Sequence, residues 1–377
     1  MSASKSEVHQ AIQNMDKGLF PSAFCKIIPD FVGGDTQYCN IMHADTAGTK
    51  TSLAYMYWKE TGDISVWKGI VEDAIVMNLD DMACVGCIDN IIFSSTIGRN
   101  RHLVSGEVIS TLINHANHFA DKLKTLGVNI HLSGGETADV GDIVRTADVG
   151  YTAFARMKRE DVIDPDIKAG AVIVGLASYG QASYETSYNG GMGSNGLTSA
   201  RHDVFAPIYR DKYPECYDPS TDRNYIFCGS KKLTDTIMID GEEMPIGKLV
   251  LSPTRTYLPV IKGVLAKHGD SIQGMIHNTG GAHTKVLKFC KNPVKIIKDS
   301  MPELPPLFRL IKEESGVDMR EMYQVFNCGI RLEFYVENSS VVEEIMQISK
   351  SFNIDAFIIG RVEESEKLEL DVMGNRY

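Results

Sequence analysis

Apolar residues recur at helical spacing in two long stretches of the chain. The first, residues 65–86, carries apolar side chains at every third or fourth position: Val66, Ile70, Ala74 and Met77. Residues 105–127 repeat this spacing and stop at Gly127, a residue type that commonly ends a helix. The pattern predicts two long amphipathic helices, each with one face in the core.

Shorter segments rich in β-branched and aromatic residues, bounded by turn residues, predict strands. In the first half these segments are "IDNIIFSS" (88–95), "VNIHLS" (128–133) and "DVGYTAFARM" (148–157). A charged break with Pro165 and Gly170 at residues 158–171 then precedes the strand "AVIVGLAS". We therefore expect two domains, residues 1–164 and 165–377.

The second half mixes its elements irregularly. A polar, glycine-rich loop is expected at 178–196, a helix after "SPTRTYLPVI", a strand leading into "MIHNTGG", and a helix followed by a strand at 339–363. This mixture favours an α+β domain over a regular parallel sheet.

Composition narrows the classes of function. The 377 residues, 43% of them hydrophobic, can bury a sizeable core, and 38 basic against 49 acidic residues leave a net charge of −11. This balance argues against nucleic acid or an anionic membrane as partner. A polar amino terminus and the lack of a long uncharged apolar stretch predict a cytoplasmic protein.

The eight cysteines are scattered, and we expect them to be reduced. Cys84 and Cys87 form the one close pair, which has two interpretations. They are half of a redox or zinc site, or they are small buried side chains. The second is favoured because no other cysteine pair or histidine stands at ligand spacing.

Acidic residues interrupt the apolar pattern of the helix predicted at 65–86. Asp73 and Asp80 are seven positions apart and share one face, while Asp81 lies about 80° around the axis. One interpretation is a solvated face. The other is a cation site, because no basic residue nearby in the sequence pairs with these acids.

Two further segments place acids where strands are expected to end. Asp45 precedes Gly48 and Lys50, and "SGGETADV" (133–140) brings Glu136 after two glycines. Such carboxylates suit Mg²⁺ held together with substrate phosphates, with Lys50 on the phosphate oxygens. Alternatively, Gly48 only permits a turn and Lys50 is a surface lysine. Neither segment matches the Walker pattern or a GxGxxG fingerprint.

A series of motifs resembles one family. In order these are "HADTAGTK", "MNLDDMACVG", "SGGETADV", "GGMGSNGLTSAR", "LSPTRTYLPVI", "IHNTGGAHTKVL" and "EMYQVFNCGI". The series is similar to the aminoimidazole ribonucleotide synthetase (phosphoribosylformylglycinamidine cyclo-ligase) family of purine biosynthesis. The resemblance implies an α+β fold of two domains, each with a mixed sheet flanked by helices, and a homodimer of amino-terminal domains. It also implies ATP- and Mg²⁺-dependent closure of formylglycinamidine ribonucleotide to aminoimidazole ribonucleotide.

Matched motif by motif, the resemblance implies the site residues. The ATP site would comprise Asp45, Thr49, Lys50, Asp73, Asp81, Gly134, Gly135, Glu136 and Thr137. Four of these, Asp45, Asp73, Asp81 and Glu136, would bind the metal. The substrate would meet Ser194, Asn195, Gly196, Thr279, Gly280 and Gly281. The catalytic candidates are Lys50, Asp81 and His277.

The chain departs from the family pattern at several positions. Gly193 stands where a histidine usually precedes "SNG", Ala282 replaces a third glycine after "TGG", and Lys285 stands where many members carry an acid. An amino-terminal element of the family has no clear counterpart before Val8. The general acid is therefore not assigned from the motifs.

Other functions remain open at this stage. Selenophosphate synthetase, thiamine-phosphate kinase and the hydrogenase-maturation dehydratase share the ATP-site architecture, although the reactive cysteines of the first and third have no match here. A nucleotide-binding paralogue without activity is a second alternative. A third is an α/β protein whose acids all lie on the surface.

Overall fold

The computed structural model describes residues 14–337 and 339–377, which form two large β-sheets and one two-stranded sheet. The first sheet has the strand order β1-β2-β5-β3-β4, and only β3 and β4 run parallel. Its strands are β1 (Ile27–Pro29), β2 (Tyr38–Thr46), β3 (Ile91–Arg99), β4 (Ile130–Asp139) and β5 (Ala147–Lys158).

Helices cover one face of this sheet. They are α2 (Lys50–Thr61), α3 (Val66–Ala83) and α4 (Gly106–Thr125), of which α3 packs on β2 and β5 and α4 packs on α3 and β4. The two helices predicted from apolar spacing are therefore confirmed as α3 and α4.

The second sheet has the order β14-β13-β10-β12-β6-β11-β9, with β10 and β13 parallel and the other pairs antiparallel. Its strands are β6 (Val172–Ala177), β9 (Ile272–His277), β10 (Val294–Lys298), β11 (Ile330–Val336), β12 (Ala356–Glu364), β13 (Glu369–Val372) and β14 (Asn375–Arg376). A separate hairpin pairs β7 (Thr236–Ile239) with β8 (Glu242–Pro245). Every residue of β11 is buried, because β6 and β9 flank it and the sheet is covered.

The remaining helices belong to the second half of the chain. They are α5 (Leu197–Val204), α6 (Ile208–Lys212), α7 (Ile246–Val250), α8 (Leu258–His268), α9 (Pro306–Ser315), α10 (Met319–Val325) and α11 (Ser339–Ser351). Helix α11 packs on β6, β12 and α8, and α8 in turn contacts α3 of the first half.

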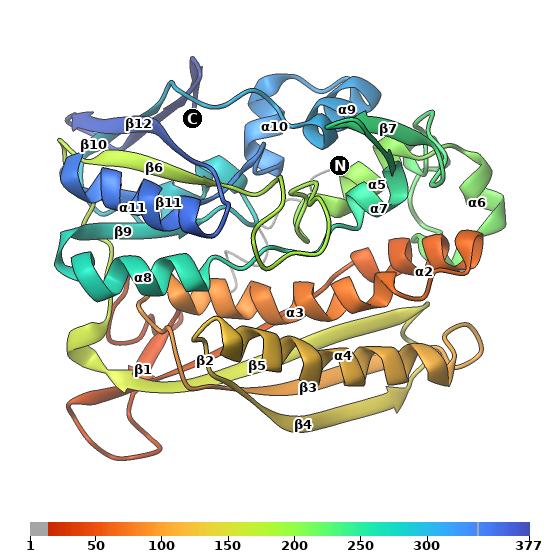
Figure 1. The fold of residues 1–377 in the computed structure, drawn as a ribbon, viewed down its shortest axis with the longest axis horizontal. Helices are drawn as coiled ribbons and strands as arrows, with labels where there is room; N and C mark the ends of the chain where they lie inside the picture. The colour runs from red at the N-terminus through yellow and green to blue at the C-terminus, as the bar shows by residue number, and fades with distance from the viewer. Residues whose placement is uncertain (1–13, 338) are drawn as a thin grey trace.

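Helix α3 lies between the two halves of the molecule. Figure 1 shows it crossing the middle of the view, with the first sheet on one side and α8 and the second sheet on the other. Its middle and carboxyl-terminal residues are buried almost all round, the charged ones included. A helix covered on both sides must satisfy its polar groups inside the protein, since water does not reach them.

Strand β4 corrects one expectation. The segment "SGGETADV" was expected to follow a strand end, but β4 continues through both glycines to Asp139, paired with β3. A Cβ atom at Gly135 would lie 2.1 Å from the carbonyl oxygen of Ser95, so the missing side chain serves the close approach of the two strands at a bulge. Gly135 is thus explained by strand packing within the sheet.

The other face of the first sheet is uncovered in the described part of the chain. Figure 1 shows α3 and α4 on the same side of this sheet. On the opposite side Met42, Phe154 and Ile92 stand directly across from one another on β2, β5 and β3. Met42 is 65% exposed and Ile92 42% exposed. An apolar row of this kind on a sheet surface is typical of a contact surface.

Several sequence predictions can now be compared with the fold. The α+β class with mixed sheets flanked by helices is confirmed. Cys84 and Cys87 are buried and unpaired, as favoured. None of the helices among residues 14–337 and 339–377 is long and apolar enough to cross a membrane. The domain limit at residue 164/165 stays a prediction, and the departure noted before Val8 lies outside the described residues.

Candidate active site

Two carboxylates of α3 bind a segment of the second half of the chain, residues 252–257. Asp73 Oδ1 accepts hydrogen bonds from the backbone N–H and the hydroxyl of Thr254, at 2.8 and 2.6 Å. About two turns further along the same face, Asp80 accepts from the Thr256 hydroxyl at 2.6 Å and from the backbone N–H of Tyr257 at 2.8 Å. Both carboxylates are fully buried, so the solvated-face interpretation of these acids is wrong.

Lys50 belongs to the same contact. Its Nζ atom, fully buried at the start of α2, lies 2.9 and 2.8 Å from the two carboxylate oxygens of Asp73 and donates to the backbone oxygen of Ser252 at 2.6 Å. Burial lowers the pKa of Lys50, and the charge of Asp73 opposes this. The surface-lysine interpretation is therefore wrong. In this structure the ammonium group joins the two domains, and its predicted contact with a phosphate stays a prediction.

Asp81 faces a different set of groups, as its 80° offset predicted. Its Oδ1 atom lies 2.7 Å from Nδ1 of His277 at the end of β9, and its Oδ2 atom lies 3.6 Å from Nε2 of His43 on β2. Burial alone would raise the pKa of Asp81, but Lys285, His277 and His43 outweigh it and lower the pKa well below the usual range. Asp81 is therefore an ionised carboxylate held at the junction of the two domains.

Asp45 lies on the same side of the first sheet as Asp81. Its side chain is half-buried, and the hydrogen bond found for its carboxylate comes from the backbone N–H of Thr46 at 2.7 Å. Burial raises the pKa of Asp45, and the negative charge of Asp81 adds to the rise. Such a carboxylate would be stabilised by a cation.

Lys285 is the lysine that acts on both of these carboxylates. Its charge lowers the pKa of Asp81 and opposes the rise at Asp45. The ammonium lies 4.3 Å from the centre of the Phe24 ring and donates to the hydroxyl of Thr279. We call Asp45, Asp81, His277 and Lys285 the Asp81 cluster.

The remaining predicted ATP-site residues lie elsewhere. Glu136 pairs with Thr96 on the uncovered face of the first sheet and is exposed, as are Gly134, Gly135 and Thr137 in the same edge strand. Thr49 is exposed, with its hydroxyl 2.9 Å from that of Thr198. Within the described residues no group of three or more His, Cys, Asp or Glu side chains could hold a metal ion. The structure thus brings Asp45 and Asp81 together, whereas Lys50 neutralises Asp73 and Glu136 faces outward.

The predicted substrate loop packs against the second sheet. A Cβ atom at Gly193 would lie 1.8 Å from Nη1 of Arg331, and one at Gly196 would lie 2.6 Å from the ring of Phe326. Ser194 and Asn195 are half-buried between these glycines, and Asn195 Oδ1 is 3.4 Å from Nη2 of Arg331. The glycines of this loop are therefore needed for close packing, and the side chains of Ser194 and Asn195 remain partly open to a ligand.

The turn after β9 carries the other predicted substrate residues. Thr279 is buried, and Gly280 and Gly281 are half-buried. Ala282 has a φ angle of +44°, in the left-handed region that favours glycine. Ala282, which the resemblance places at a third glycine, thus adopts a backbone conformation that favours glycine.

A buried polar network lies under this turn. Glu333 on β11 accepts from Lys298 at 2.6 Å and from Asn278 at 2.8 Å, and Nδ1 of His283 is 3.2 Å away. Burial alone would raise the pKa of Glu333, but Lys298 and His283 lower it to about 2. Since His283 and Asn278 flank the turn, this network fixes the turn from below.

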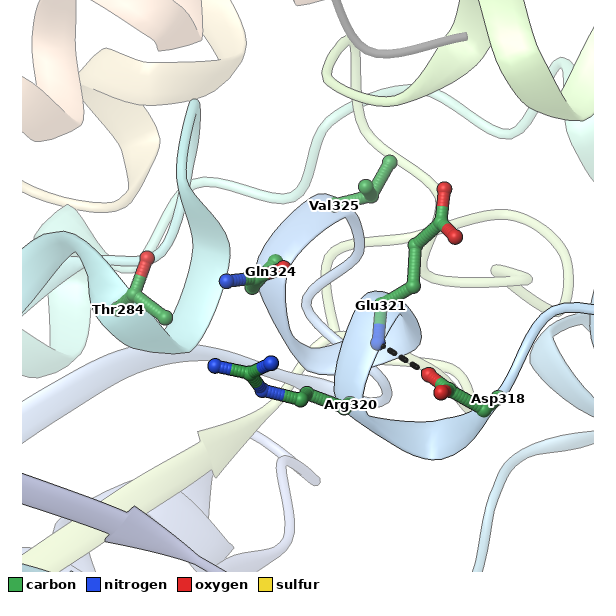
Figure 2. Close-up of a pocket in the computed structure, with 6 residues that line it drawn as sticks. All are labelled: Thr284, Asp318, Arg320, Glu321, Gln324 and Val325. Atoms are coloured by element: carbon green, nitrogen blue, oxygen red, sulfur yellow. Dashed lines mark hydrogen bonds between the residues drawn. The ribbon is translucent and has the colours of Figure 1, made fainter. Parts of the chain in front are cut away.

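A cavity of about 500 Å³ opens next to this turn. Its lining combines residues of α10 and its amino-terminal cap with one residue after the turn: Thr284, Asp318, Arg320, Glu321, Gln324 and Val325. Figure 2 shows Arg320 and Gln324 pointing toward the side on which Thr284 lies. None of the predicted site residues lines this cavity, so we locate the site by its charged groups.

Sequence reasoning assigned no role to five participants in the site: His43, Thr254, Lys285, Glu333 and Arg331. A signal existed for the last two. The strand "IRLEFYV" carries two charges in an otherwise apolar run, and charged residues in a buried strand are kept only when they are paired or functional. His43 and Thr254 carried no comparable signal.

Fold and site together define a class: two-domain α+β proteins in which loops of the second domain close over a carboxylate-bearing helix of the first. Residues 26–157 match the family model of the amino-terminal domain of AIR synthase related proteins, and residues 231–373 match the model of its carboxyl-terminal domain. The chain belongs to the AIR synthase related family.

Curated relatives extend over most of the chain. It is 27% identical over 345 residues to the phosphoribosylformylglycinamidine cyclo-ligase of Methanocaldococcus jannaschii, covering 90% of this chain and 81% of the relative. The cyclo-ligase of Staphylococcus carnosus is 28% identical over 328 residues, covering 85% of this chain and 79% of the relative.

Solved structures share the fold at low identity. Phosphoribosylformylglycinamidine synthase II from Thermotoga maritima superposes with a TM-score of 0.55 at 11% identity, covering 98% of this chain, which spans only 47% of that protein. The chain in a structure titled HypE-HypF complex gives a TM-score of 0.55 at 14% identity, covering 99% of this chain and 97% of that one. These similarities describe the fold alone.

We predict that Lys50→Met destabilises the protein by about 3–5 kcal/mol, because it leaves the carboxylate of Asp73 buried without its counter-ion. Chemical denaturation monitored by fluorescence measures this. The double variant Lys50→Met, Asp73→Leu should recover part of the loss, since it removes both charges but leaves the buried donors of Thr254 without their acceptor.

Lys262→Met is the matched control. Lys262 also joins the two halves, with Nζ 2.7 Å from Asp89, but both side chains are about 30% exposed. A partly exposed pair contributes about 0–1 kcal/mol. Equal losses in Lys50→Met and Lys262→Met would contradict the assignment of Lys50 to a buried contact.

Proposed function

We propose that this protein catalyses the ATP-dependent cyclisation of formylglycinamidine ribonucleotide to aminoimidazole ribonucleotide, with release of ADP and phosphate. The observation that carries the proposal is the Asp81 cluster, where a carboxylate of the first domain meets His277 and Lys285 of the second. The curated relatives match this chain over most of their own length, and their names support the same reaction.

Asp45 and Asp81 fit one Mg²⁺ ion bound together with a nucleotide. Mg²⁺ is usually bound through one or two carboxylates plus substrate phosphates, and a half-buried Asp45 beside an ionised Asp81 is such a pair. When bound, the ion would neutralise charge on the triphosphate. Asp73 is not part of this revised set, because Lys50 already neutralises its charge and Thr254 hydrogen-bonds its Oδ1 atom.

The proposed reaction has two steps. The formamide oxygen attacks the γ-phosphorus of ATP and ADP leaves. The neighbouring amidine nitrogen then attacks the activated carbon, loses a proton, and phosphate leaves with the oxygen. Both steps depend on position and on charge neutralisation, so no covalent intermediate with the protein is required.

Within this scheme each part of the cluster has a task. Lys285 would neutralise charge on a phosphate near Asp45 and Asp81, since its ammonium already lies within their electrostatic reach. His277 has a pKa lowered to about 4, mainly by burial, so its ring stays neutral and would hold the carboxylate of Asp81 in place. Ser194 and Asn195 would contact the substrate, together with the turn at Thr279–Gly281.

An assay with formylglycinamidine ribonucleotide, ATP and Mg²⁺ tests the proposal directly. We expect aminoimidazole ribonucleotide and ADP in equal amounts. ATP hydrolysis without this product would favour another ATP-using member of the superfamily. Binding of ATP without any turnover would favour an inactive paralogue. Titration calorimetry that detects no heat with millimolar ATP and Mg²⁺ would reject the nucleotide site.

We predict that Asp81→Asn lowers kcat by about 100-fold or more while the protein stays folded. The amide oxygen can still accept the His277 hydrogen bond, but the negative charge is lost from a site where electrostatic stabilisation is a large term. Steady-state kinetics and thermal unfolding measure the two effects.

Asp139→Asn is the control, because Asp139 is exposed on β4 and, within residues 14–337 and 339–377, its carboxylate bonds Arg99 alone. Its rate should equal that of the wild type. Unchanged turnover in Asp81→Asn would refute the metal and charge assignment at Asp81.

The uncovered face of the first sheet is the proposed homodimer contact. Two copies meeting on Met42, Phe154 and Ile92 would each bury an apolar row that water now contacts, and a two-fold axis makes the surface complementary to itself. Glu136 lies on this same face, so dimerisation would bring it close to the partner subunit. This arrangement would account for its distance from Asp81.

We predict that Met42→Lys shifts the protein from dimer to monomer, because it places a charge in the apolar row. Analytical ultracentrifugation across a concentration series measures the change. Met238→Lys is the matched control, since Met238 is 61% exposed on the β7–β8 hairpin against 65% for Met42. A wild-type protein that stays monomeric at high micromolar concentration would contradict the proposed contact.

A further inference from the structure

Arg331 on β11 is a fully buried arginine without a carboxylate partner. Its side chain is 1% exposed, and none of the ion pairs in residues 14–337 and 339–377 includes it. A buried guanidinium without a paired charge is unfavourable, so it is retained only when its hydrogen bonds serve a purpose. Burial lowers the pKa of Arg331, and the charges of Tyr257 and of the α3 carboxylates oppose this.

Its contacts join two parts of the site. Nε donates to Nε2 of His277 at 3.1 Å. Nη1 lies 3.4 Å from the backbone oxygen of Met192, and Nη2 lies 3.4 Å from Oδ1 of Asn195 and 3.1 Å from the sulfur of Met77. The Arg331 guanidinium thus bonds His277 of the Asp81 cluster through Nε, and its two Nη atoms face the predicted substrate loop.

These contacts fix the tautomer of His277. A guanidinium has only donors, so Nε2 of His277 must accept and carries no proton in the neutral ring. The proton is therefore on Nδ1, which donates to Asp81 at 2.7 Å. Arg331, His277 and Asp81 form a directed chain from the second sheet to helix α3.

We propose that Arg331 is a positioning residue: it holds His277 in the tautomer that donates to Asp81 and holds the Met192–Asn195 loop in place with the same guanidinium. The geometric part of this proposal stands on the contacts above. Its consequence for turnover rests on the proposed function.

Gly193 provides a second way to disturb the position of the Arg331 guanidinium. A Cβ atom at this position would lie 1.8 Å from Nη1 and 2.4 Å from Cζ of Arg331. A side chain at 193 and the guanidinium of Arg331 therefore compete for one space. In this chain a glycine on the loop leaves that space to the arginine on the strand.

The first test measures the tautomer in the wild-type protein. Histidine labelled with ¹⁵N distinguishes a protonated from an unprotonated ring nitrogen, and His277 is assigned by the signal lost in His277→Gln. We expect the proton on Nδ1 and none on Nε2. A His277 ring protonated on Nε2 would overturn the proposal whatever the enzyme's activity.

The second test removes the guanidinium. In Arg331→Met we expect the His277 signals to show a mixture of tautomers and kcat to fall about 10- to 100-fold, the range found when groups that orient a site residue are removed. Arg331→Lys retains a charge but lacks the planar fork, so it should recover stability more than kcat. A merely structural role would lower the melting temperature and leave the tautomer unchanged, which would reject the proposal.

Gly193→Ala displaces the guanidinium without altering it, and we expect the same spectral and kinetic changes. Gly170→Ala is its control. Gly170 has a φ angle of +91° against +66° for Gly193, and a Cβ atom there would have no neighbour within 4 Å, so the variant reports backbone strain alone. Wild-type spectra and rates in Gly193→Ala would contradict the proposal, and this variant decides if Arg331→Met does not fold.

The outcomes separate this proposal from the proposed function. The expected tautomer in a protein that forms no aminoimidazole ribonucleotide would reject the reaction and keep the positioning role. Full cyclo-ligase activity, with the tautomer of His277 unchanged in Arg331→Met or Gly193→Ala, would support the reaction and reject the positioning role.

Discussion

The structure depends on the burial of three carboxylates on one helix between two domains. Asp73, Asp80 and Asp81 leave water when the second domain closes over α3, and buried carboxyl groups are stable inside a protein only when donors replace the water. The segment around Thr254 and Thr256 supplies those donors to the first two. The buried carboxyl groups of α3 therefore gain their hydrogen-bond donors only when the two domains associate.

The carboxylates on the two faces of α3 have different roles. Asp73 is neutralised by Lys50 and hydrogen-bonded by Thr254, so a ligand there would compete with existing contacts. Asp81 instead meets two histidines and the charge of Lys285, with Asp45 close enough for the two carboxylates to act on each other. A ligand that brings positive charge to that end of the helix would relieve this repulsion, whereas at Asp73 it would have to break an existing pair.

Much of the fold could be predicted because it follows from local periodicity. The apolar spacing that predicted α3 and α4 is a property of neighbours along the chain, as is the 80° separation of Asp80 and Asp81. The extent of β4 could not be predicted in this way. Two glycines usually end a strand, but here pairing with β3 continues it, because Ser95 requires a residue without a side chain opposite it.

The sequence by itself determined which side chains share a face, and its motifs indicated the family. It could not decide what covers each face. Asp81 and His277 are separated by 196 positions, and their contact is made only when β9 packs against α3. The pairing of Lys50 with Asp73 and the orientation of Glu136 toward the open face likewise come from tertiary packing. The physical reason is that periodicity sets directions along one element, while burial and charge compensation are set by the elements packed against it.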